Sequence, residues 1–392
     1  MSATRPAEVV ATAPHTTSDA FDLYDEQQGV VLQHGDTRLS AGGRSTSVVV
    51  PAGSDLVRRA ASLAERAFAE IGGTGIAMGA LPYDGSCDAV LRIPDLRGDR
   101  PPSGVGPELD WAVTELIPDP LPVEYEAAVE AALAAIEAGD VEKVVLARSL
   151  VVTAGSPIDP RVVARRLREA EPGSFVFVVA LPGASTLVGA SPELLVRREG
   201  RIVSSEPLAG TARRSADPVR DAEIARQLLG TLKERREHRL VADAVADALA
   251  PFCSDLVVDA EPSLSPTGTL WHLRTAVRGT LRPDAPDALT LAAALHPTPA
   301  ICGTPQAAAA ALIARLESVE RRFYSGLVGW VDARGDGEWA ITLRCAEVSG
   351  ATARLHAGAG IVAGSDPAAE DLETEAKFGI MLRALGAAPA ED

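Results

Sequence analysis

The order of strand-like and helix-like segments restricts the fold of this chain more than any other feature. Apolar runs typical of strands come in groups, and helical segments come between the groups. The regular alternation of strand and helix that builds a parallel sheet does not occur. The sequence therefore predicts an α+β fold with largely antiparallel sheet. Its clearest strand segments are residues 143–148, 175–181, 327–331, 339–345 and 353–357.

The chain divides into three parts by composition. Residues 1–19 are polar and rich in Thr, Ala and Pro, which predicts a flexible tail. Residues 20–120 contain short strand-like runs broken by Gly and Pro, with one helix near Asp55–Ile71, and form an N-terminal α+β part of the fold. Residues 121–392 carry the longest periodic segments, and we expect them to form the catalytic core.

The boundary between the second and third parts is rich in proline. Pro118, Pro120 and Pro122 predict a linker or turn, because such a run cannot continue a helix or a central strand. A helix over Val123–Ala138 follows this segment. Residues 218–250 are predicted to be helical in two pieces, and a final helix is predicted over Asp366–Leu385.

The net charge of −17 excludes several classes of partner. Nucleic acid and anionic membrane surfaces would be repelled, because no basic run offsets this charge. The first residues lack the apolar core of a signal peptide, and the longest uncharged stretch is interrupted by proline and glycine. Four scattered cysteines agree with a reducing compartment. We therefore expect a cytoplasmic protein that contacts neither membrane nor nucleic acid.

Two acidic pairs stand out because each presents two carboxylates on one helix face. Glu234 and Glu237 are three residues apart on one predicted helix, and Glu370 and Glu373 are three apart on another. Lys377 follows Glu373 on the same side. Two such faces across a cleft would suit Mg²⁺, which takes oxygen ligands.

Each pair also has an ordinary explanation. Thr231 and Glu234 have the spacing of a capping box, and Glu373 with Lys377 is a common pair on a solvated helix face. Spacing alone leaves the choice open.

Three further features could belong to a site. Gly358-Ala359-Gly360 lies between a predicted strand and a predicted helix, so its backbone either approaches an anion or simply turns. Lys143 opens an apolar strand; such a lysine is either solvated at the strand edge or buried, and a buried amine can act as a base. Glu193 lies in the segment Ser-Pro-Glu-Leu-Leu.

Taken together, these segments resemble the chorismate-utilising enzymes, a family that includes anthranilate, aminodeoxychorismate, salicylate and isochorismate synthases. The resemblance covers residues 121–386. The matching segments, in order, are KVVLAR at 143–148, GASPELL at 189–195, EPLAGTARR at 206–214, KERREH at 233–238, WHLRT at 271–275, HPTPAICGTP at 296–305, YSGLVGW at 324–330, ITLRCAEV at 341–348 and HAGAGIVAGSDPAAEDLETEAK at 356–377.

The resemblance implies a chorismate-binding fold, with two antiparallel sheets packed together and flanked by helices. It implies Mg²⁺ as cofactor, with Glu237 and Glu373 as ligands and Glu234 and Glu370 holding the metal or its waters. It makes Lys143 the base that activates water and Glu193 the acid that protonates the leaving hydroxyl. It also implies a group of substrate-binding residues: Gly210, His272, Ala300, Tyr324, Arg344, Gly358 and Lys377.

Three positions indicate the branch of the family. Aminating members usually carry Gln where Lys143 stands, and aminodeoxychorismate synthases usually carry Lys where Ala209 stands. Aminating and salicylate-forming members usually carry Thr where Ala300 stands. The resemblance therefore implies an isochorismate synthase that isomerises chorismate reversibly for siderophore or menaquinone synthesis. It implies a monomer that needs no glutaminase subunit.

Two alternatives remain. A salicylate synthase would form isochorismate and then eliminate pyruvate. A non-catalytic homologue would bind chorismate or a partner without turning it over, but this chain retains both Lys143 and Glu193.

Overall fold

The computed structural model describes residues 21, 24, 26, 29–41, 45–94 and 109–387. The predicted flexible tail, residues 1–19, lies outside the described residues. Within them the chain forms two large sheets and one small one, and the strands of these sheets pair antiparallel. The predicted α+β class with antiparallel sheet is confirmed.

The first sheet has nine strands. Its centre is the long pair β7 and β21, whose registers run from Lys143 opposite Val362 to Thr153 opposite Thr352. Its strands, in spatial order, are β17 (Gly303–Thr304), β7 (Lys143–Ala154), β21 (Thr352–Val362), β20 (Cys345–Ser349), β9 (Ser185–Ser191), β8 (Phe175–Leu181), β1 (Val30–His34) and β2 (Thr37–Ala41), with β6 (Val113–Asp119) on the outer edge of β7.

The second sheet also has nine strands, and a three-stranded sheet stands beside it. The strands of the second sheet, in order, are β13 (Cys253–Val258), β16 (Val277–Leu281), β11 (Ile202–Glu206), β10 (Leu194–Glu199), β19 (Gly337–Ile341), β18 (Leu327–Asp332), β4 (Ile76–Leu81), β5 (Ala89–Pro94) and β3 (Ser45–Val50). The small sheet contains β12 (Leu208–Arg213), β15 (Leu270–Arg274) and β14 (Ser263–Pro266).

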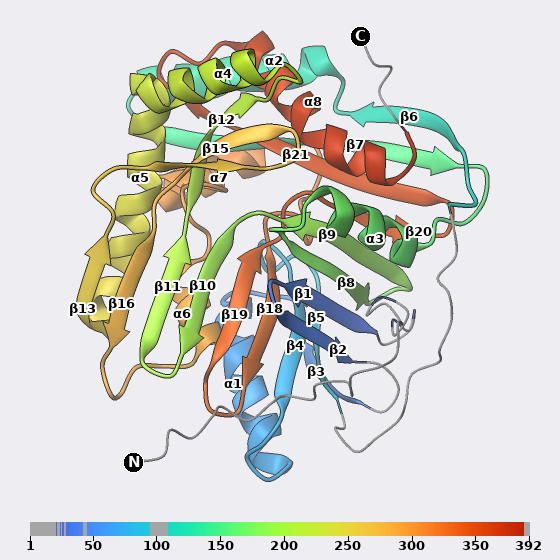
Figure 1. Ribbon diagram of the computed structural model, residues 1–392, viewed down its shortest axis with the longest axis vertical. Helices are drawn as coiled ribbons and strands as arrows, with labels where there is room; N and C mark the ends of the chain where they lie inside the picture. Colours follow the sequence, from blue (N-terminus) through green and yellow to red (C-terminus); the bar gives the residue numbers. More distant parts are fainter. Residues whose placement is uncertain are drawn as a thin grey trace.

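The two large sheets pack face to face, and helices cover their outer faces (Figure 1). Between the sheets lies an apolar cluster that includes Leu32, Met78, Phe177 and Val328. The helices are α1 (Leu56–Glu70), α2 (Pro122–Glu137), α3 (Pro160–Ala170), α4 (Pro218–Gly230), α5 (Leu232–Leu249), α6 (Ala288–Leu295), α7 (Gln306–Leu316) and α8 (Pro367–Ala384), with a short 3₁₀ turn η2 (Ala250–Phe252) after α5.

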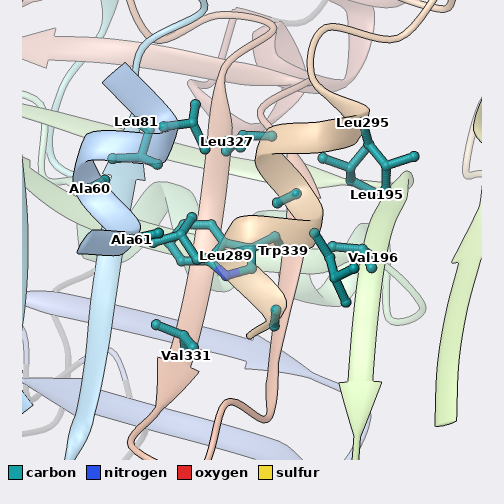
Figure 2. Close-up of a cluster of buried hydrophobic side chains, with 14 of the residues drawn as sticks. Ala60, Ala61, Leu81, Leu195, Val196, Leu289, Leu295, Leu327, Val331 and Trp339 are labelled. Carbon is teal, nitrogen blue, oxygen red and sulfur yellow. The ribbon is translucent and has the colours of Figure 1, made fainter. Parts of the chain in front are cut away.

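The largest apolar cluster lies between the second sheet and helices α1 and α6. Figure 2 shows Trp339 of β19 in this cluster, with Ala61 of α1 and Leu289 of α6 nearby. The Trp339 side chain is fully buried. Burying an aromatic side chain of this size contributes much of the stability of such a layer.

The strands of the N-terminal part are shared between the two sheets. β1 pairs with β8 in the first sheet, whereas β4 pairs with β18 in the second. The segment before residue 120 therefore completes both sheets.

Three local predictions were wrong, each for an identifiable reason. The first part of the proline-rich segment is not a linker. Residues 113–119 form the edge strand β6, which pairs only with β7. An edge strand tolerates Pro118, since its other side needs no N–H donor. Gly358-Ala359-Gly360 is no turn and continues β21 opposite β7. The segment 339–345 is two strands, broken at Arg344 by a left-handed backbone (φ 48°).

Candidate active site

Ten of the site residues predicted from the sequence line one pocket between the first sheet, the small sheet and helices α5 and α8. They come from segments that lie far apart in the chain. The ten are Glu193, Gly210, Glu237, His272, Ala300, Tyr324, Arg344, Gly358, Glu373 and Lys377. Lys143, Glu234 and Glu370 are not among the lining residues, although all three lie beside groups that are.

Lys143 begins β7 and is completely buried. Its side-chain nitrogen Nζ lies 2.9 Å from Oε1 of Glu237 on α5. Gly360, on the neighbouring strand β21, makes this pairing possible. A Cβ at Gly360 would lie only 2.2 Å from Glu237 Oε1 and 3.2 Å from Lys143 Cε. Gly360 therefore leaves the space in which Lys143 and Glu237 meet.

The two predicted acidic faces lie on α5 and α8. On α5, burial raises the pKa of Glu234 to about 7, with Glu237 adding to the effect, and one oxygen accepts a hydrogen bond from Thr211 N at 3.3 Å. On α8, burial and Glu373 raise the pKa of Glu370. Carboxylates that raise one another's pKa in this way share one electrostatic environment.

Three lysines neutralise three of these carboxylates. Lys143 pairs with Glu237, Lys233 Nζ lies 3.1 Å from Glu370 Oε1, and Lys377 Nζ lies 2.5 Å from Glu373 Oε1. In the described part of the chain, no three His, Cys, Asp or Glu side chains are close enough together to hold a metal ion. We attribute the separation of the Glu237, Glu370 and Glu373 carboxylates to their pairing with three different lysines.

The donor set nevertheless fits a hard divalent cation. Glu237 and Glu373 both line the pocket, they come from two different helices, and both offer carboxylate oxygens. Oε1 of Glu237 occupies the place that a Cβ at Gly360 would take. Residues that could hold Mg²⁺ are thus Glu237 and Glu373 directly, with Glu234 and Glu370 behind them.

Glu193 lies in the short connection between β9 and β10 and is 4% exposed. Burial raises its pKa to about 7, although Leu208 N donates to its Oε1 at 3.4 Å. A carboxyl group of this kind is protonated in part at neutral pH, so it can donate a proton to a leaving group.

Arg344, His272 and Thr211 form a short chain of contacts across the pocket wall. Arg344 Nη2 lies 3.3 Å from His272 Nε2, and His272 Nδ1 lies 3.2 Å from Thr211 Oγ1. Burial, followed by the charge of Arg344, keeps the pKa of His272 well below its usual range. Since a guanidinium only donates, Nε2 accepts and the hydrogen of this neutral imidazole is on Nδ1. His272 thus orients Arg344.

A second cation and a phenol complete the pocket. Lys377 Nζ donates to the carbonyl of Gly358 at 2.8 Å, which fixes this ammonium above β21. Tyr324 stacks on His356, with 5.3 Å between the ring centroids. Burial raises the pKa of Tyr324 to about 12, so its hydroxyl is a neutral donor. Arg344 and Lys377 give the pocket local positive charge in a chain of net charge −17.

Several lining residues were missed at the sequence level. Apolar and small residues carry little chemical signal of their own, although all of the missed residues lie inside the matching segments. The missed residues are Val145, Pro192, Leu208, Thr211, Ile301, Ser325 and Leu343; Ala209, considered above only as a branch marker, and Gly360, considered only for its backbone, also line the pocket.

The fold and this pocket define a chorismate-binding enzyme. The chorismate binding enzyme family matches residues 111–386, and the chain belongs to this family. The predicted family resemblance is therefore confirmed.

Three relatives place the chain more narrowly within the family. The putative isochorismate synthase MenF of Mycobacterium tuberculosis is 46% identical over 82% of this chain and 90% of its own length. Isochorismate synthase DhbC of Bacillus subtilis is 44% identical over 79% of this chain and 81% of its own. The crystal structure of a putative 2,3-dihydroxybenzoate-specific isochorismate synthase, DhbC from Bacillus anthracis, is 39% identical, with a TM-score of 0.85 over 94% of this chain and 99% of that one.

None of the helices in the described ranges has the length and apolar character needed to cross a membrane.

Proposed function

We propose that this chain is an isochorismate synthase that converts chorismate reversibly into isochorismate. The observation that carries the proposal is the buried carboxyl of Glu193, whose pKa is raised to about 7, in a pocket that also holds Arg344 and Lys377. An acid that can protonate a hydroxyl and two cations for a dicarboxylate are what this isomerisation requires. The names of the relatives support the same activity.

The residues divide the reaction between them. Lys143, in its neutral amine form, accepts a proton from water as the water oxygen bonds to C2 of chorismate. Electrons shift around the ring, the C4–oxygen bond breaks, and Glu193 gives its proton to the departing hydroxyl, which leaves as water. Arg344, held by His272, and Lys377, held by Gly358, bind the two carboxylates. Each proton transfer runs backwards in the reverse reaction, so the isomerisation is reversible.

Mg²⁺ is part of the proposal. When bound at Glu237 and Glu373, it supplies Lewis-acid withdrawal of charge from the ring carboxylate. In this chain Glu237 Oε1 also lies 2.9 Å from Lys143 Nζ, so the same carboxylate contacts the base and would hold the metal. The proposal also includes chorismate as the substrate and the absence of a glutaminase subunit. The enzyme is proposed to be monomeric and cytoplasmic.

One incubation tests the assignment. Purified protein with chorismate and Mg²⁺ at neutral pH is separated by chromatography, with fluorescence detection of salicylate and anthranilate. We expect isochorismate to approach an equilibrium with unconsumed chorismate, and added ammonium to yield no anthranilate. Salicylate formed together with an equal amount of pyruvate from the first turnovers would instead show a salicylate synthase, and no product at all would show a binding homologue.

A further inference from the structure

Lys233 is a cation in an unfavourable place. It lies in the first turn of α5, where the positive end of the helix dipole disfavours a lysine. Its side chain reaches across to α8 and pairs with Glu370, the ammonium lying 3.1 Å from Oε1. Glu234 and Glu237 also lie within electrostatic reach of this ammonium. Nothing in the helix itself explains Lys233, so its explanation lies in the carboxylates around it.

The three lysines of the acidic cluster differ in how firmly they are held. Lys143 is completely buried, and Lys377 is anchored to the carbonyl of Gly358 as well as to Glu373. The side chain of Lys233 is 35% exposed, whereas that of its partner Glu370 is 4% exposed. Lys233 can therefore leave its carboxylate partner for water at a small cost in free energy. Glu370 needs a cation, because its carboxylate is buried.

We infer that Lys233 is a built-in competitor for the metal: its ammonium and a divalent cation draw on the same carboxylates, and the metal binds only as Lys233 withdraws. The inference rests on the metal site of the proposed function and goes beyond it. Lys233 would weaken metal binding to the substrate-free protein. The carboxylates of chorismate restore the negative charge that the metal requires, so metal and substrate would bind together more tightly than apart.

Calorimetric titration of Mg²⁺ alone into substrate-free protein tests this role. Lys233→Gln should tighten Mg²⁺ binding on the order of tenfold, the size expected when one nearby unit charge is removed from a partly buried site. Lys233→Arg keeps the charge and should stay close to the wild type. The control is Arg235→Gln, which removes a cation from the same helix whose partner is Glu261, outside the pocket, and it should leave Mg²⁺ binding unchanged.

A second measurement guards against misfolding. Thermal midpoints are taken with and without saturating Mg²⁺. Lys233→Gln should lower the midpoint of the metal-free protein, because Glu370 loses its partner, and should enlarge the rise that Mg²⁺ produces.

The outcomes separate the two proposals. If Lys233→Gln leaves Mg²⁺ affinity unchanged, weakens it, or changes it only as much as Arg235→Gln does, Lys233 is a structural cross-link and the inference is wrong. If the wild type binds no Mg²⁺ and turns over chorismate in excess EDTA, the metal part of the proposed function fails, and this inference fails with it.

Discussion

The apolar core around Trp339 and the pocket around Glu193 adjoin one another, yet they bury opposite kinds of side chain. In the core, Trp339 packs with Leu289 and Ala61 and stabilises the fold by removing apolar surface from water. At the pocket, the buried groups include Glu193, which lines it, and Lys143, which lies behind Glu237. Burying a charge costs free energy unless a partner compensates it. The comparison teaches that core residues should set stability, and site residues should set turnover.

Substitution of Glu237 should have the largest effect, because it should lower both turnover and stability. Glu237→Ala should reduce turnover to background, because a proposed metal ligand is lost. It should also lower the free energy of unfolding by about 3–5 kcal/mol, since Lys143 is left buried without its partner. Steady-state assay and urea denaturation measure the two effects.

The control for Glu237 is an apolar pair. The double variant Lys143→Met with Glu237→Leu should recover much of the stability and none of the turnover, because well-packed apolar groups can replace a buried ion pair. Full turnover in Glu237→Ala would remove this residue from the site.

Substitution of Glu193 should affect turnover and leave stability almost unchanged. Glu193→Gln keeps the shape of the side chain but cannot donate a proton, so kcat should fall by about 10²–10⁴-fold with the free energy of unfolding almost unchanged. Lys143→Ala should lower kcat within the same range. Near-normal kcat in either folded variant would mean that the acid and base are other residues.

Substitution of Trp339 should instead lower stability and leave turnover almost unchanged. Trp339→Ala removes a fully buried side chain and should cost about 3–5 kcal/mol of stability. Well below its lowered thermal midpoint, the variant should keep a near-normal kcat, because the tryptophan does not line the pocket. A drop in kcat as large as that of Glu193→Gln would show that core and site are not separable.

The pH dependence of turnover gives the smallest effect. The raised pKa of Glu193, about 7, means that its proton-donating form predominates below pH 7 and declines above it. The forward kcat/KM should therefore fall roughly tenfold per pH unit well above pH 7. In Glu193→Gln this decline should disappear, and a decline that persists there would assign it to another group.

The sequence predicted the helices well, and it predicted strands wherever the apolar pattern was strong. The helix expected near Asp55–Ile71 is α1, and the helix expected over Asp366–Leu385 is α8, with Asp366 as its N-cap. Both carry clear local signals. The break at Arg344 carries no such local signal. Its left-handed backbone depends on tertiary contacts, which the residue type alone does not indicate.

The site was predicted more through the resemblance than through spacing. Spacing alone paired Glu234 with Glu237 and Glu370 with Glu373, but it could not tell that α5 and α8 face one pocket. It also could not show that Lys143 pairs with Glu237, because that contact depends on the space left by Gly360 on a third element. Long-range contacts of this kind are fixed by packing between elements.

The sharing of the N-terminal strands between two sheets has a consequence during protein synthesis. β4 ends at Leu81, but the strand β18 that it pairs with begins only at Leu327. At about 5–20 residues per second, a ribosome needs roughly 10–50 s to make the intervening segment. Throughout that time β4 has one unpaired edge, and such an edge is a template for pairing with another chain. A nascent chain of this protein therefore exposes, for that time, a strand edge that the finished fold covers.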